Sequence, residues 1–194
     1  MSRGIFRLKQ VYEEQLSGTW STRDDVWLTP SPFRLAHPFG YFGGGLPQVS
    51  TIDRIDYSND TATASARGPL SSAKRMYAAT GNSDFGYFGG GYGGSPLNTV
   101  DRIDYTNDTA TASVRGSLSL ARYRPAATGN SSFGYFGGGY NGTNNYSTVD
   151  RIDYTNDTET AVEKGPLSAA NGYLAAAGNQ SFGYFGGGNL VYLQ

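Results

Sequence analysis

The heptapeptide Phe-Gly-Tyr-Phe-Gly-Gly-Gly decides the fold, because it occurs at residues 39–45, 85–91, 133–139 and 182–188. Successive copies begin 46, 48 and 49 residues apart, by subtraction of 39 from 85, 85 from 133 and 133 from 182. A repeat of this length is typical of β-propellers and related arrays, in which each unit forms one small sheet. The repeat therefore organises nearly the whole chain.

A second block, Asp-Arg-Ile-Asp-Tyr, stays in phase with the first and begins at Asp53, Asp101 and Asp150. Each copy is followed by Ser-Asn-Asp-Thr or Thr-Asn-Asp-Thr, which is turn chemistry, and then by TATAS, TATAS or TETAV. We expect four strands per unit. They are an Ala-rich strand that leads into Gly-Asn, the FGYFGG strand, the TVDRIDY strand and a short strand formed by the TATAS-type block.

The composition agrees with an all-β protein. The 194 residues include 28 Gly, 15 Tyr and 10 Phe, a mixture of turn formers and strand formers. Cysteine is absent and the formal net charge is -1, so the sequence offers neither disulfides nor a basic field for nucleic acid. We see no signal peptide and no apolar run long enough to span a bilayer, and we expect no membrane insertion.

The third strand predicts charge pairing between neighbouring sheets. Strict alternation places Val100, Arg102 and Asp104 on one face and Asp101, Ile103 and Tyr105 on the other, so both faces are mixed. In a propeller blade both faces meet neighbouring blades, where Arg can pair with Asp. The residues expected in such inter-blade pairs are Asp53, Arg54, Asp56, Asp101, Arg102, Asp104, Asp150, Arg151 and Asp153.

The search for catalytic chemistry finds no candidate. His37 is the only histidine, and no G-x-S-x-G elbow frames a serine. The acids show no calcium-loop spacing, and the glycine run at 88–94 is followed by neither a helix nor a Lys-Ser or Lys-Thr pair. We therefore expect no catalytic residues, no metal and no cofactor, and a function in binding.

The segment between the glycine run and the third strand is where the copies diverge. Aromatic and amide side chains gather there, and these suit recognition of a sugar or a protein. The alternative is that they are ordinary loop tips that vary freely. The candidate partner-binding residues are Tyr92, Tyr140, Asn141, Asn144, Asn145 and Tyr146.

These motifs resemble the kelch repeat over roughly residues 33 to 194. The glycine doublet lies in GYFGGG, the Tyr ends TVDRIDY, and the later basic residue is represented by Arg75 or Arg122. The resemblance implies a kelch-like β-propeller of about four short blades. One departure is that the Trp usually found about six residues after the Tyr of the third strand is replaced by Ala or Thr, which implies lighter packing between blades.

The fourth unit ends after FGYFGGGNLVYLQ and lacks its third and fourth strands. A half-blade does not bury its face alone. Residues 6–24 carry a Tyr12 to Trp20 spacing like that of the missing strands, so one prediction is that the amino-terminal segment, 1–32, closes the ring. In the alternative this segment is an anchor and a neighbouring subunit, such as an identical chain, completes the blade.

The opening MSRGIFRLKQVYEEQLSGTW, with DRIDYTNDTATAS and AATGNSSFGYFGGG, is similar to virion structural proteins of tailed bacteriophages from marine bacteria. This resemblance implies a virion location in the neck, tail or fibre attachment. It also implies contacts with other virion proteins through the amino-terminal segment, and with a host-surface glycan or protein through the repeats. The alternatives are a kelch-type protein-interaction module and a carbohydrate-binding propeller, with hydrolysis least favoured because no convergent pair of acids is evident.

Overall fold

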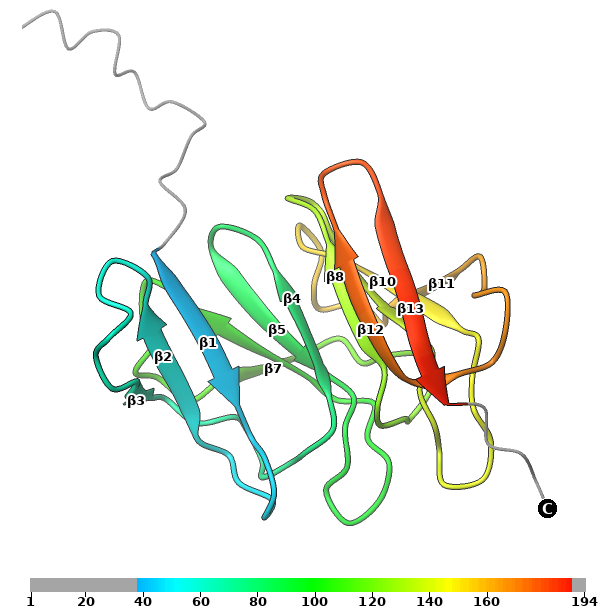
Figure 1. Cartoon of the computed structure of the whole chain (residues 1–194), viewed down its shortest axis with the longest axis horizontal. Coiled ribbons are helices and arrows are strands. Elements are labelled where there is room, and N and C mark those ends of the chain that lie inside the picture. The colour runs from blue at the N-terminus through cyan, green and yellow to red at the C-terminus, as the bar shows by residue number, and fades with distance from the viewer. Residues whose placement is uncertain (1–37, 190–194) are drawn as a thin grey trace, which may run out of the picture. The chain divides into compact units, whose positions relative to one another are not determined.

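A computed structural model describes residues 38–189, which form four antiparallel sheets (Figure 1). The segment expected at 1–32, its residues 6–24, and residues 190–194 lie outside the described range. The first sheet contains β1 (Phe39–Gly43), β2 (Ile52–Asp56) and β3 (Ser65–Arg67), and the second contains β4 (Ala78–Gly81), β5 (Phe85–Gly89), β6 (Val100–Asp104) and β7 (Ser113–Arg115). The third sheet contains β8 (Ala126–Gly129), β9 (Phe133–Gly137), β10 (Val149–Asp153) and β11 (Val162–Lys164). The fourth contains β12 (Gly172–Gly178) and β13 (Gly183–Asn189).

The all-β expectation is confirmed, and the two complete sheets are four-stranded meanders in which consecutive strands pair. The closed propeller that we expected is not seen in residues 38–189. Within this range the first sheet lacks the Ala-rich strand, and the fourth has only its first two strands.

The fourth strand begins later than the sequence predicts, at the last residue of each TATAS-type block. Turn chemistry explains the shift. In the first unit the backbone N–H of Ala62 donates to the carbonyl of Asn59, and the Thr61 hydroxyl donates to the Asn59 side chain. The Asn-rich turn therefore takes up residues that the alternation had assigned to a strand.

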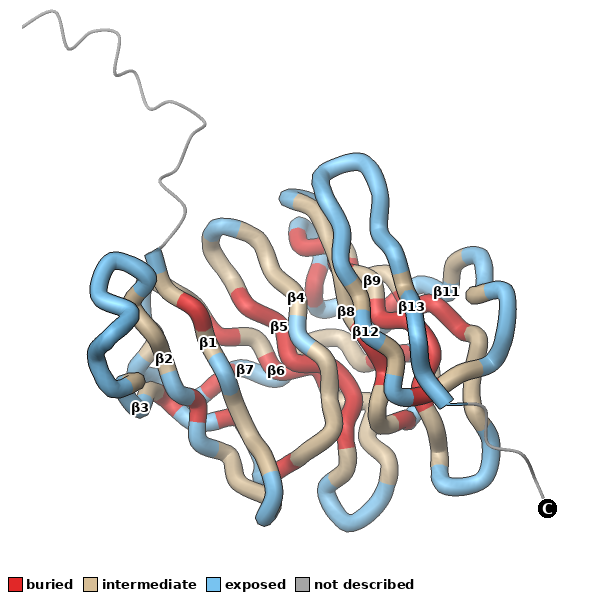
Figure 2. The backbone as a smooth tube through the Cα atoms, in the orientation of Figure 1, coloured by how far each residue is buried: buried red, intermediate tan, exposed pale blue. Residues whose placement is uncertain are grey.

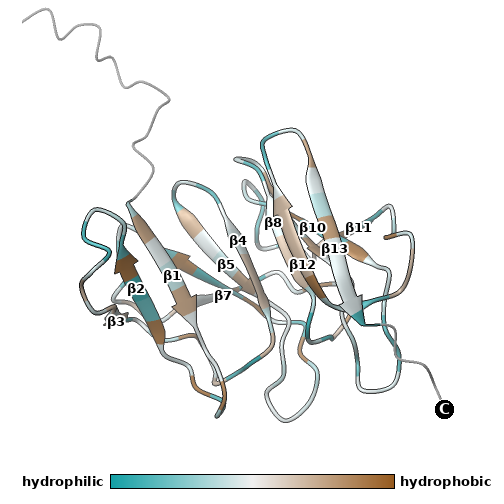
Figure 3. Ribbon diagram, in the orientation of Figure 1, coloured by the Kyte–Doolittle hydropathy of each residue, from teal (hydrophilic) through white to brown (hydrophobic). Residues whose placement is uncertain are grey.

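Pairing between the FGYFG and DRID strands fixes which side chains share a face. Tyr87 lies directly opposite Arg102, and Tyr41 lies opposite Arg54 in the first sheet. Directly opposed residues point to the same side of an antiparallel pair. Strand β2 carries polar residues between its two isoleucines, so teal lies between brown segments in Figure 3. The first three sheets thus each have one face carrying both the Tyr and the Arg.

This face holds a carboxylate from the next unit. Asp108, in the turn after the third strand of the second unit, accepts a hydrogen bond from the Tyr41 hydroxyl at 3.0 Å and one from Arg54 at 2.7 Å. The Arg67 Nε lies 3.4 Å from the same Asp108 oxygen. We call this group of one Tyr, two basic side chains and one Asp a carboxylate clamp.

The second clamp repeats the first one unit later. The Tyr87 hydroxyl donates to Asp157 at 2.9 Å, Arg102 donates to it at 2.7 Å, and the Arg115 Nε lies 3.7 Å away. Stacked tyrosines accompany each clamp. The rings of Tyr87 and Tyr154 lie 4.8 Å apart with an interplanar angle of 14°, and the first interface has an equivalent pair. The interface between the first and second sheets and that between the second and third are therefore built alike.

A glycine lets the backbones approach at each clamp. Gly116 donates its N–H to the Asp157 carbonyl at 2.9 Å, and an added Cβ would meet the carbonyl oxygen of Glu159. Gly68 has the same relation to Asp108 and Ala110. Any larger residue here would push the sheets apart.

The core lies between the sheets on either side of the second unit (Figure 2). Strands β5, β6 and β9 supply much of it, whereas β13 is almost wholly exposed. One cluster contains Ile52, Leu70, Phe88, Ile103 and Ala112, and the other contains Tyr87, Val100, Leu118, Phe136, Ile152, Tyr154 and Ala161.

Removing the charge of Asp157 tests the clamp. Asp157→Asn should lower the free energy of unfolding by about 2–3 kcal/mol, because Arg102 would lose its hydrogen-bonded anion and Arg115 its ion-pair partner in a largely buried place. Urea denaturation measures the change. The matched control is Asp60→Asn, in the same turn of the first unit, where the side chain is exposed and the change should stay within about 0.5 kcal/mol. Equal effects of the two substitutions would contradict the assignment.

Alkaline pH should also weaken the fold. Burial, followed by the hydrogen bond to Asp108, raises the pKa of Tyr41 to about 12, and burial raises the pKa of Tyr154 to about 12. The folded state retains these protons after the unfolded chain has lost them, so stability is constant below pH 10 and falls between pH 10 and about 12.

Urea midpoints measured from pH 8 to 11.5 will show the fall, and Tyr154→Phe should make it shallower. A flat profile up to pH 11.5, with every tyrosine titrating near pH 10, would contradict this assignment.

Candidate functional site

The loops that follow the glycine runs form the candidate site. Gly90 and Gly91 have φ angles of 72° and 110°, and Gly138 and Gly139 have angles of 67° and 108°. This left-handed conformation, which suits glycine, turns the chain out of the second strand. The next residue is Tyr92 in one unit and Tyr140 in the other.

Tyr123 joins these two predicted residues into a row. Its ring centroid lies 5.3 Å from that of Tyr92 at 73°, and 5.4 Å from that of Tyr140 at 77°. Both contacts are edge-to-face, a favoured arrangement of aromatic pairs. Reciprocal backbone hydrogen bonds between Tyr123 and Tyr140, of 2.9 and 2.8 Å, fix one pair, and Arg75 pairs with Tyr92 in the same way.

Arginines flank the tyrosines. The Arg124 guanidinium lies 4.9 Å from the centroid of Tyr123 and 3.9 Å from that of Tyr173, and Arg75 lies 5.2 Å from Tyr92. Such contacts hold the planar guanidinium against the ring. We call the set Arg75, Tyr92, Tyr123, Arg124, Tyr140 and Tyr173 the tyrosine–arginine row.

Strained backbone positions underlie the row. Met76, Arg124 and Tyr173 occupy equivalent places in three units and have φ angles of 57°, 59° and 61°. This region is unfavourable for residues with side chains and persists only where the surroundings impose it. Here the Arg124 N–H donates to the Met76 carbonyl at 2.6 Å, and the Tyr173 N–H donates to the Arg124 carbonyl at 3.2 Å. The strain therefore coincides with an unbroken hydrogen-bonded line across the units.

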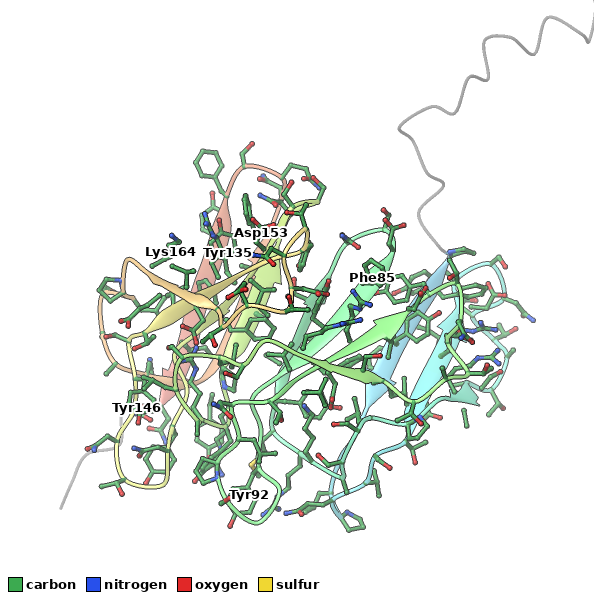
Figure 4. The ribbon with its side chains drawn as sticks, turned by 180° about the vertical axis from the view of Figure 1, so that it is seen from behind. Phe85, Tyr92, Tyr135, Tyr146, Asp153 and Lys164 are labelled. Carbon is green, nitrogen blue, oxygen red and sulfur yellow. The ribbon has the colours of Figure 1, made fainter. Side chains whose placement is uncertain are left out.

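Two of the three predicted amide side chains form hydrogen bonds within the protein. Asn141 donates from its side chain to the Tyr146 hydroxyl at 2.7 Å and accepts from the backbone of Thr143 and Asn144. Asn145 donates to the carbonyl of Asn189 in the fourth sheet at 3.0 Å. Tyr146 lies at the same end of the molecule as Tyr92 (Figure 4). The exposed Asn144 side chain, together with the rings and guanidinium groups of the row, is left to meet a partner.

Two arginines of the DRID strands form ion pairs with a neighbouring unit, as predicted, but the aspartates that they pair with lie in turns and not in the DRID strands. Arg54 reaches Asp108 and Arg102 reaches Asp157, both in turns of the following unit. Arg151 occupies the equivalent place in the third sheet and has no ion pair with any residue between 38 and 189. The sequence had not marked the turn aspartates as partners.

The first Asp of the block faces the preceding connection. Asp101 lies 3.1 Å from the Lys74 ammonium and Asp150 lies 2.9 Å from the Arg122 guanidinium, all four side chains being inaccessible to solvent. Burial lowers the pKa of Lys74, and the charge of Asp101 opposes that shift. Asp53 is exposed and forms no ion pair within the described range.

The second Asp of the block shapes a turn. Asp104 accepts from the backbone N–H and the hydroxyl of Thr106, at 2.9 and 2.7 Å. These hydrogen bonds lower the pKa of the Asp104 carboxyl. Asp56 and Asp153 make the same contacts with Ser58 and Thr155. The expectation that these three aspartates form inter-blade pairs was wrong, because local hydrogen bonds compete for them.

Tyr123, Arg124 and Tyr173 were missed from the sequence. Tyr123 and Arg124 lie just before strand β8, and Tyr173 lies at the start of strand β12, a region where we treated the basic residue only as a repeat marker. The available signal was an aromatic or basic doublet repeated at this position, as in Arg75-Met76-Tyr77 and Tyr123-Arg124. This repeated pattern differs from the loop sequences, which vary between units and on which we based the prediction of the binding residues.

Within residues 38–189, no cluster of three or more His, Cys, Asp or Glu side chains could hold a metal ion. His37 lies outside this range. In the same part of the chain no helix is long and apolar enough to cross a membrane. No protein-family model matches the chain, and no curated protein matches it.

Proposed function

We propose that this chain is a non-enzymatic structural protein of a bacteriophage virion, in the neck, tail or fibre attachment, that presents its repeat loops for assembly or host-surface binding. The observation that carries the proposal is the tyrosine–arginine row, mounted on sheets that the carboxylate clamps join in fixed register. Large rigid aromatic side chains and arginines are the groups that most often dominate binding surfaces.

The division of labour within the repeat supports a display role. Residues of the clamps and strands are nearly identical in each unit, whereas the residues at the row differ from unit to unit. The position after the glycine run is Leu46, Tyr92, Tyr140 and Asn189 in turn. A constant interior with a varied rim is the arrangement expected of a binding scaffold. The resemblance of the sequence to virion structural proteins is the basis for proposing a location in the virion.

For the fold we propose a kelch-like β-propeller. The repeat length, the four-stranded meanders and the face-to-face stacking of successive sheets support this. The fourth sheet then needs outer strands, from either the amino-terminal segment or a neighbouring subunit. A kelch-type interaction module remains the alternative in which the same surface captures a protein.

A second candidate is carbohydrate binding, which the geometry of the row favours. Half-buried tyrosine rings beside guanidinium groups can stack against the apolar face of a sugar and donate hydrogen bonds to its hydroxyls. Tyr173, with 52% of its surface exposed, offers the most open ring of the row.

Quantitative mass spectrometry of purified phage particles tests the virion role. We expect the chain to be present at a fixed ratio to the major capsid protein through successive density gradients. Loss of the chain from the particles during purification would contradict the proposal.

A glycan array tests the second candidate with the same protein. Tyr123→Ala and Arg124→Ala should each reduce any glycan signal at least tenfold, because both substitutions remove a stacking surface. Tyr57→Ala is the matched control, since Tyr57 is an exposed tyrosine outside the row. A signal that falls equally with Tyr57→Ala, or no signal at all, would count against carbohydrate binding.

A further inference from the structure

The third sheet contains a clamp without its acid. Tyr135 lies opposite Arg151, and Lys164 lies opposite Val149, which are the registers that Tyr87, Arg102 and Arg115 have in the second sheet. The equivalent residues of both other sheets hold an aspartate. No carboxylate in the described part of the chain forms an ion pair with Arg151 or Lys164, and the Arg151 guanidinium lies over the Phe133 ring, 4.3 Å from its centroid.

The backbone beside this clamp is also open. An added Cβ at Gly68 or Gly116 would meet a backbone carbonyl of the next unit, whereas a Cβ at Gly165 would have nothing within 4 Å. Val162, which replaces the Ser found opposite the Arg in the other sheets, is 53% exposed. In Figure 4, Tyr135 and Lys164 lie together at the end of the molecule away from Tyr92.

The fourth sheet has an unpaired strand edge next to the third sheet's open clamp. In the second and third sheets the FGYFG strand pairs on both sides, with the Ala-rich strand and with the DRID strand. Strand β13 pairs only with β12, so its other edge is unpaired among residues 38–189. An unpaired edge is a template for strand addition. A DRID-type strand and the short strand that follows it would pair with the free edge of β13 and would also supply the missing aspartate of the third sheet.

We propose that the open face of the third sheet and the free edge of β13 form a docking site for a two-stranded segment of another polypeptide that carries the sequence Tyr-x-x-Asp. Its first strand pairs with β13, its Tyr stacks on Tyr135, and its Asp accepts hydrogen bonds from Tyr135 and Arg151. The cationic pair Arg151 and Lys164 supplies the charge complementarity, and the chain builds the same contact internally at Asp108 and Asp157.

We assign the occupant to a separate protein rather than to residues 1–37 or to a second copy. Residues 1–37 contain no aromatic residue with an acid three positions later, since Tyr12 is followed at that place by Gln15. A second copy offers Tyr57 and Asp60, but its β2 already pairs with β1 on the edge that β13 would need. The inference does not rest on a virion role.

A labelled peptide spanning Asn98–Ser117 of this chain serves as the probe, because it contains a DRID strand, the Tyr-x-x-Asp turn and the following short strand. Added to the full chain, it should bind saturably with one peptide per chain, measured by fluorescence anisotropy. Asp108→Asn in the peptide, or Arg151→Gln in the protein, should weaken binding at least tenfold. Asp53→Asn, which also removes one charge but lies on an exposed side chain outside both surfaces, should leave it unchanged.

Gly165→Ala separates docking from folding. It should abolish peptide binding, because its Cβ occupies the space that the incoming backbone needs, while the urea midpoint of the protein stays unchanged. Failure of the peptide to bind the full chain, or binding that ignores Gly165→Ala and Arg151→Gln, would overturn the proposal. Self-association of the full chain that Asp60→Asn disrupts would overturn it in favour of a second copy.

Discussion

The carboxylate clamp is the interaction on which the rest of the structure depends. One aspartate, carried on the turn of the next unit, accepts from a tyrosine and an arginine that face each other across two strands. Because Asp157 is largely buried, a change in the distance between sheets would leave cations without an anion. The clamp therefore fixes the spacing and the register of the repeats, and the stacked tyrosines and glycine contacts follow from that spacing.

The same constraint explains why charge lies on both faces of one strand. Arg102 points to the following unit, and Asp101 points to Lys74 in the preceding connection. The second unit is thus joined to its neighbours by two different ion pairs on opposite sides. A rigid stack of this kind holds the tyrosine–arginine row in place even though two of its residues, Arg124 and Tyr173, have strained backbones. Rigidity at the row lowers the entropy lost when a partner binds.

The strands were predictable from local patterns, whereas the contacts between sheets were not. Repetition and alternation of residues predict strands at the FGYFG and DRID blocks, and both blocks form strands. The partner of Arg102 lies 55 residues later, in a turn whose Asn and Thr residues suggested only local hydrogen bonding. Tyr123 joins Tyr92 to Tyr140 only because successive sheets bring different connections together. Alternation assigns a side chain to a face, but it does not say which segment covers that face.

A double-mutant cycle between Arg102 and Asp157 tests the central claim most directly. Unfolding free energies of Arg102→Gln, Asp157→Asn and the double variant would be measured in urea at pH 7. The clamp predicts a coupling energy of about 1–3 kcal/mol, with the double variant less destabilised than the sum of the single ones. Additive effects, with coupling below about 0.3 kcal/mol, would show that the two charges act independently and that the clamp does not hold the sheets together.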